Sequence, residues 1–160
     1  MQHIDEPMLA ALRALLGPPG LRLHSVPPDA DIPGSYWGGA EAGLIGDTLF
    51  WRADTPLHSA LHEAAHWVCM TPPRRATLER DAGGDEAEES AVCYLQILWA
   101  DVLPGTSAAR VMSDMDAWGY SFRLGSTDAW LREESGDARQ WLRREGIIDG
   151  AGCLTAQLRA

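Results

Sequence analysis

Residues 55–70 read TPLHSALHEAAHWVCM, and this stretch predicts a helix with one apolar face. Thr55 followed by Pro56 is a typical helix start, because threonine can cap the first turn and proline suits the first helical position. The pattern ends after Met70, where prolines follow. The apolar face consists of Leu57, Leu61, Ala64, Ala65 and Val68. We therefore expect this helix to lie at the edge of a core.

Within this helix, residues 62–66 form the pattern HEAAH. His62 and His66 are four residues apart, so a helix places both on one face, where each can aim a ring nitrogen at a single ion. Glu63 sits one step round the helix, and an HExxH zinc site uses this carboxylate to hold the metal-bound water. The alternative is a chance match on an alanine-rich helix. The half-buried setting favours the metal site.

The whole chain limits the classes of protein to consider. Its 160 residues suffice for one domain, 1–160, with a sizeable core. A net charge of −10 argues against nucleic acid as a partner, since phosphate contacts need clustered Lys and Arg. The first residues form neither a signal peptide nor a membrane span, so we expect no membrane partner and a cytoplasmic location. Three scattered cysteines predict no disulfide framework.

The remaining pattern predicts an α+β fold that is mostly helical. Residues 5–16 have helical spacing and residues 21–26 alternate like a strand. Residues 43–45 and 48–52, joined by Gly46-Asp47, predict a β-hairpin before the HEAAH helix. Further helices are expected over 85–103 and 106–118, with two shorter ones starting near Thr127 and Asp137. We expect a core over about 43–103 and a C-terminal helical part over about 106–148.

A catalytic zinc ion takes three protein ligands, so one more donor is needed. His58 is an unsuitable donor, because it lies about 12 Å along the helix axis from His66. The branch of zinc enzymes with the pattern HExxHxxGxxH is also excluded, since Cys69 and Pro72 occupy its Gly and third His positions. The third ligand is therefore expected from another segment.

Four acids at the start of the 85–103 helix compete for this role, namely Asp85, Glu86, Glu88 and Glu89. Helical phase places Glu88 near the centre of the apolar stripe and Glu89 further round. An ionised Glu among apolar residues needs a cation partner, which a zinc ion could be. We predict His62, His66 and Glu88 as the ligands, with Glu89 as second choice. The alternative is that the acids simply favour a helix N-terminus.

With its hairpin, HEAAH helix and following acidic helix, the chain resembles the gluzincin type of zinc metallopeptidase, and within it the compact bacterial domains of the ImmA/IrrE kind. The resemblance covers roughly residues 43–103. It implies a zincin-like core, a zinc cofactor and a peptide or protein substrate. It also implies that Glu63 takes a proton from the zinc-bound water and passes it to the leaving amine.

These families often carry Ala three residues, and Asp or Asn four residues, after the ligand Glu. Counted from Glu88, Ala91 matches and Val92 departs; counted from Glu89, neither Val92 nor Cys93 matches. This comparison favours Glu88.

Other parts of the site are less determined by the sequence. Tyr120 and Arg123 are candidate donors to an oxyanion, with a core tyrosine and a surface arginine as the alternatives. The strand 48–52 could offer an open edge to an extended peptide, or could be an ordinary paired strand. Trp67 could form a wall of a substrate pocket. Rival functions are a non-catalytic zincin-like domain with a structural or partner-binding metal, and a helical interaction protein without metal.

Overall fold

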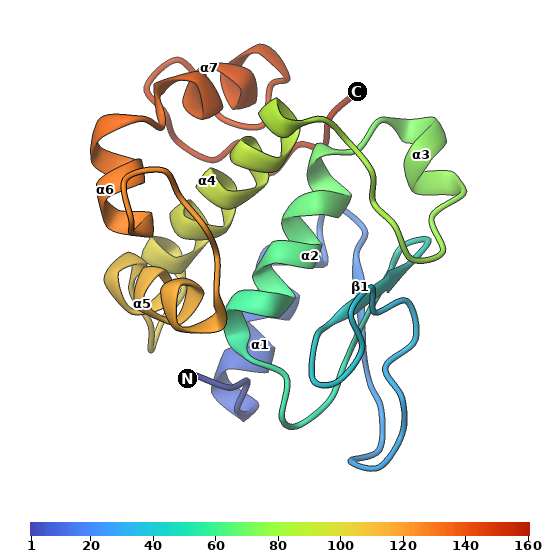
Figure 1. Cartoon of the computed structure of the whole chain (residues 1–160). Helices are drawn as coiled ribbons and strands as arrows, with labels where there is room; N and C mark the ends of the chain where they lie inside the picture. The colour runs from blue at the N-terminus through green and yellow to red at the C-terminus, as the bar shows by residue number, and fades with distance from the viewer.

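Helix α2 (Leu57–Cys69) crosses the middle of the molecule, between a small sheet and helix α4 (Glu86–Val102) (Figure 1). The computed structural model describes residues 1–160 and confirms an α+β fold that is mostly helical. The other elements are α1 (Glu6–Leu16), β1 (Arg22–Ser25), β2 (Gly43–Ile45), β3 (Thr48–Trp51), α3 (Pro72–Ala76), α5 (Ala108–Trp118), α6 (Thr127–Glu133) and α7 (Gly136–Arg144).

Small side chains let α2 lie deep in the core. Ala60, Ala64 and Ala65 are almost completely buried, and Leu57 and Leu61 have no exposed surface. The predicted start of this helix needs a correction. Thr55 does not cap it, because the Thr55 hydroxyl accepts a hydrogen bond from the Arg52 backbone N–H at 2.9 Å and Pro56 precedes the first helical residue. Thr55 stabilises the turn between β3 and α2 instead.

The hairpin is confirmed: β2 and β3 pair antiparallel around Gly46, which has a φ of +56°. Strand β1 pairs parallel to the other side of β3, so the strand order is β1-β3-β2. Of the two alternatives for residues 48–52, an open edge or an ordinary paired strand, the structure shows the paired strand, because β3 is the central strand. The parallel pairing of β1 with β3 joins segments that are distant in sequence, so no local sequence pattern predicts it.

The outer edge of β2 is covered by the loop before it. At Gly43, an added Cβ would lie 2.1 Å from the Pro33 carbonyl oxygen and 2.4 Å from the Ser35 nitrogen. At Gly34, with a φ of +77°, it would lie 2.4 Å from the Leu44 carbonyl oxygen. Only glycine permits this approach of backbone to backbone. The sheet thus has no open edge at β2 where the loop crosses it.

The helices after α2 follow the sequence closely. Asp85 caps α4, and Ser107 caps α5, each accepting a backbone N–H three residues on. The connection between α2 and α4 contains the short helix α3, which the sequence analysis does not predict. The last residues fold back on the core, where the Arg159 N–H donates to the Val68 carbonyl at 3.0 Å. None of the helices combines the length and apolar character that crossing a membrane requires.

Replacing Gly43 by alanine should destabilise the protein, because the new methyl group meets backbone atoms that cannot rotate away. We expect a loss of about 1–3 kcal/mol in the free energy of unfolding, measured by thermal or urea denaturation. Gly136→Ala is the matched control, since a Cβ there meets nothing within 4 Å. Equal stabilities of the two variants would contradict the tight crossing of the loop over β2.

Candidate metal centre

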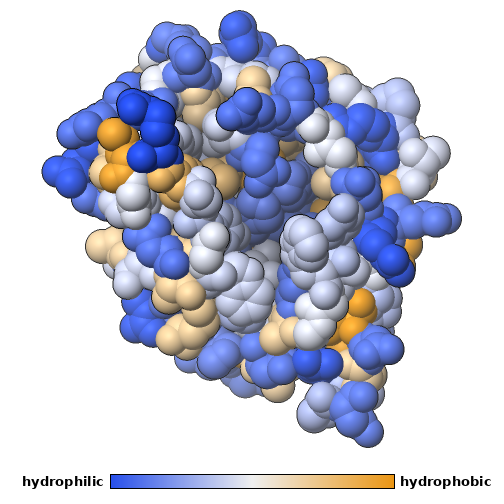
Figure 2. Space-filling view, viewed as in Figure 1, coloured by the Kyte–Doolittle hydropathy of each residue, from blue (hydrophilic) through white to orange (hydrophobic).

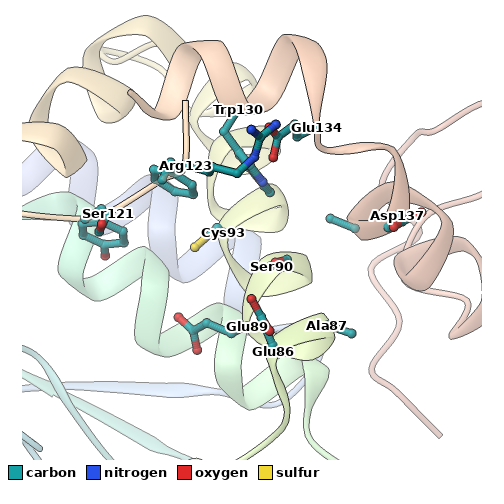
Figure 3. A pocket seen from close by; sticks show the side chains of 13 residues that line it. Glu86, Ala87, Glu89, Ser90, Cys93, Ser121, Arg123, Trp130, Glu134 and Asp137 are labelled. Carbon is teal, nitrogen blue, oxygen red and sulfur yellow. The ribbon is translucent and has the colours of Figure 1, made fainter. Parts of the chain in front are cut away.

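Three side chains from two helices converge between α2 and α4. His62 Nε2 and His66 Nε2 lie 3.1 Å apart, and Glu89 reaches across from α4 with Oε1 3.1 Å from His62 and Oε2 3.2 Å from His66. Figure 3 shows the Glu89 side chain leaving α4. Neighbouring donors of a tetrahedral zinc ion, at bonds of about 2.0–2.1 Å, lie about 3.3 Å apart. The donor types and their spacing therefore fit zinc.

The orientation of His62 is fixed by a buried glutamine. Gln96 Oε1 lies 2.7 Å from His62 Nδ1, and its Nε2 donates to the His58 carbonyl at 3.2 Å. Because the amide oxygen can only accept, Nδ1 carries the proton and Nε2 keeps its lone pair toward His66 and Glu89. Gln96 has no exposed surface, so this contact is protected from water. Sequence reasoning missed Gln96, although it stands as a polar residue within the apolar part of α4.

The electrostatics favour a cation among these three side chains. Burial raises the pKa of Glu89, but hydrogen bonds from His62 and His66 outweigh it and hold that pKa well below its usual range. Burial lowers the pKa of His62, yet its surroundings, including Tyr120, Cys93 and Glu89, raise it well above 6.5. Two imidazole nitrogens that face each other this closely need a hydrogen atom or a metal ion between them, because two lone pairs would repel each other.

Glu63 faces a cleft beside the three candidate ligands. The cleft has a volume of about 200 Å³ and is lined by His62, Glu63, His66 and Glu89, with one wall from residues 36–41 and another from 80–83. Figure 2 shows that this face of the molecule is hollowed near its centre and that the hollow is hydrophilic. Burial raises the pKa of Glu63, while His62 and His66 lower it. A carboxylate in this position can exchange a proton with a molecule in the cleft.

The structure corrects the predicted third ligand. Glu88 does not lie with the histidines: its carboxylate accepts hydrogen bonds from Arg74 at 2.9 and 2.8 Å and from Arg159 at 3.0 Å. Glu89, the second choice, takes the place beside His62 and His66. The phase argument located the buried acid, since Glu88 is only 3% exposed. Its cation partners are two arginines, which no helical pattern could identify.

Glu88 holds together segments that are distant in sequence. Arg74 follows α2, and Arg159 lies near the C-terminus, where its guanidinium also contacts Glu145 at 3.2 Å and stacks 5.0 Å above the Trp141 ring. Gly84, with a φ of +95°, leaves room for the carboxylate, because a Cβ there would lie 1.7 Å from Glu88 Oε2. Glu88 is thus part of the fold rather than of the cleft.

The candidate oxyanion donors do not face the cleft. The Tyr120 hydroxyl lies 3.4 Å from His58 Nδ1, and its ring packs edge-on against His62 with centroids 5.4 Å apart. Burial raises the pKa of Tyr120 to about 12, so the hydroxyl stays protonated. Arg123 pairs with Glu134. Tyr120 therefore packs against His62, and neither residue lines the cleft that contains Glu63.

The aromatic wall of the cleft comes from residues that the sequence analysis did not single out. Trp67 is 4% exposed and lies under Arg75, away from the cleft. Tyr36 and Trp37 line the cleft and are 52% and 82% exposed. Glu41 fixes their loop by accepting hydrogen bonds from the Ser35 hydroxyl and the Trp37 N–H. In the sequence, the signal for this aromatic wall was the presence of two aromatic residues in a loop rich in Gly and Pro.

The chain matches no known protein family, no curated protein and no solved structure. The resemblance to gluzincins is therefore carried by the HEAAH motif alone. The candidate metal site is supported by the geometry of His62, His66 and Glu89.

Exchanging each of the two neighbouring acids for glutamine should separate their roles. Glu89→Gln is expected to weaken zinc binding at least about 10–100-fold, because it removes a donor, with little change in the stability of the metal-free protein. Glu88→Gln should keep zinc affinity and lower the free energy of unfolding by about 2–4 kcal/mol, because it leaves two arginines without their partner. Zinc competition titrations and thermal unfolding measure the two effects. Weakened zinc binding in Glu88→Gln alone would refute the assignment.

His58 should make the protein sensitive to acid. Burial, and then the charge of His62, lower the pKa of His58 to about 4, whereas an unfolded histidine titrates near 6.5. The unfolded chain therefore binds the proton first, and stability falls as the pH drops from 6.5 to 4. His58→Asn should remove roughly 2–3 kcal/mol of this loss. Denaturation at both pH values with a chelator present tests this, and an unchanged pH dependence in the variant would exclude His58 as the cause.

Proposed function

We propose that the protein is a zinc-dependent hydrolase that cleaves peptide bonds. The observation that carries this proposal is the convergence of His62, His66 and Glu89 beside Glu63, all facing one cleft. Two imidazoles and one carboxylate form a common ligand set of catalytic zinc. A structural zinc site closes all four positions with protein ligands, whereas this group offers three. The three-donor set thus favours catalysis over a purely structural or partner-binding metal.

Each residue has a distinct part in the proposed reaction. Zinc held by His62, His66 and Glu89 would lower the pKa of a bound water toward neutrality and polarise the carbonyl under attack. Glu63 accepts a proton from the attacking water and donates it to the leaving amine, so that both products leave neutral at the reacting atoms. Gln96 keeps His62 in the tautomer that has a free Nε2. Arg80 brings a guanidinium to the cleft, where a carbonyl oxygen gains negative charge.

We also propose that the substrate is a peptide and that the protein acts in the cytoplasm. A peptide is favoured because the cleft is open, polar near the metal position and bounded by the exposed rings of Tyr36 and Trp37. The three cysteines are free, which supports the reducing environment of the cytoplasm.

Glu63→Gln tests the function directly. The amide keeps the shape of the side chain and cannot accept the proton of water, so peptide hydrolysis should fall at least about 100-fold while zinc stays bound. Hydrolysis is measured on a peptide library by mass spectrometry, and zinc content by metal analysis. Glu6→Gln, which removes a carboxylate from the first turn of α1, is the matched control. Full activity in Glu63→Gln would reject the role of Glu63, and a wild-type protein that takes up no zinc would reject the metal centre.

A further inference from the structure

A second and larger cavity adjoins the candidate metal centre. Its volume is about 710 Å³, within the usual range for ligand sites, and it lies between α4, the 120–123 segment, α6 and α7 (Figure 3). Glu89 lines this cavity and also the cleft that contains Glu63. The cleft and the cavity therefore adjoin each other at Glu89, next to the candidate metal centre.

The inner lining of the cavity is apolar. Phe122 and Trp130 form an aromatic pair with ring centroids 5.0 Å apart and planes inclined by 31°. Trp130 is 7% exposed, Cys93 is 5% exposed, and Ala138 is 3% exposed, so each is fixed by packing before any ligand arrives. This lining suits the hydrocarbon part of a long side chain, and aromatic faces also attract cations.

The charges around the cavity are mostly negative. The lining contains four carboxylates and one arginine, because Glu86, Glu89, Glu134 and Asp137 accompany Arg123. Arg123 is paired with Glu134, and Glu89 belongs to the candidate metal centre. Glu86 and Asp137 are the two remaining carboxylates of the lining, and both are exposed.

A helix N-terminus by itself explains part of this pattern. Glu86 lies in the first turn of α4 and Asp137 in the first turn of α7, where carboxylates are favoured by the helix dipole. The dipole does not explain why two helices from different parts of the chain direct these turns to one cavity next to the metal centre. Together, an apolar interior and an anionic rim match a side chain with a hydrocarbon stem and a cationic end.

We propose that this cavity binds an arginine or lysine side chain of the peptide substrate, close to the bond that is cleaved. The proposal rests on the proposed peptidase function and deepens it, because it names the class of peptide that the site selects. The net charge of −10 also favours the binding of basic peptides, since it attracts them and repels acidic ones.

A binding experiment tests this preference without requiring turnover. The Glu63→Gln protein with added zinc is titrated with blocked Ala/Gly heptapeptides that contain one central arginine or one central citrulline. Citrulline has the shape of arginine without its charge. We expect the arginine peptide to bind about 4- to 25-fold more tightly, since each of two exposed carboxylates contributes about 2- to 5-fold. The difference should shrink in 0.5 M salt.

The variant Glu86→Gln/Asp137→Asn, made in the same background, should lose most of the preference for the arginine peptide. Glu6→Gln/Asp29→Asn removes the same charge outside the cavity and should keep the preference. Thermal unfolding verifies that both variants fold. Equal affinity of the Glu63→Gln protein for the two peptides, or no binding of either, would overturn the proposal. A charge preference in a protein whose wild type hydrolyses no peptide would instead refute the peptidase function and leave the basic-side-chain site in place.

Discussion

The contact between α2 and α4 is the constraint on which the candidate site depends. The alanines of the HEAAH helix are small enough for α4 to approach closely, and both helices are buried along this contact. His62 and His66 come from one helix and Glu89 from the other, so their separations are set by packing rather than by a flexible loop. The core thereby brings three polar groups together at the boundary between apolar interior and open cleft.

Two successive residues of α4 show how strongly helical direction determines the role of a carboxylate. Glu88 and Glu89 differ by about 100° in direction, and this rotation takes one into a pair of arginines and the other to a pair of histidines. The arginines are permanently charged and satisfy a buried carboxylate at any ordinary pH. The histidines can exchange a proton for a metal ion, so only Glu89 belongs to a centre whose charge can change.

The sequence predicts the parts of the fold that arise from local patterns. Helical periodicity identifies α2 and α4, and the turn residues identify the hairpin, because these signals are contained within a few residues. The parallel pairing of β1 with β3 and the contact of Arg159 with Glu88 join distant segments, so they leave no local signal. HEAAH likewise identifies two of the three converging donors. The third donor could not be identified in this way. The apolar stripe separates the buried Glu88 from Glu89, but the partners of each acid come from other segments of the chain.

Arg74 connects the stability of the fold to the shape of the cleft. The same guanidinium that holds Glu88 also donates to the carbonyl of Ala82, within the segment 80–83 that forms one wall of the cleft. Moving this wall away from α4 means breaking the hydrogen bond between Arg74 and the Ala82 carbonyl. The shape of the cleft entrance is therefore coupled to an ion pair of the fold, so that a substitution of Arg74 would change the access of molecules to the cleft as well as the stability of the protein.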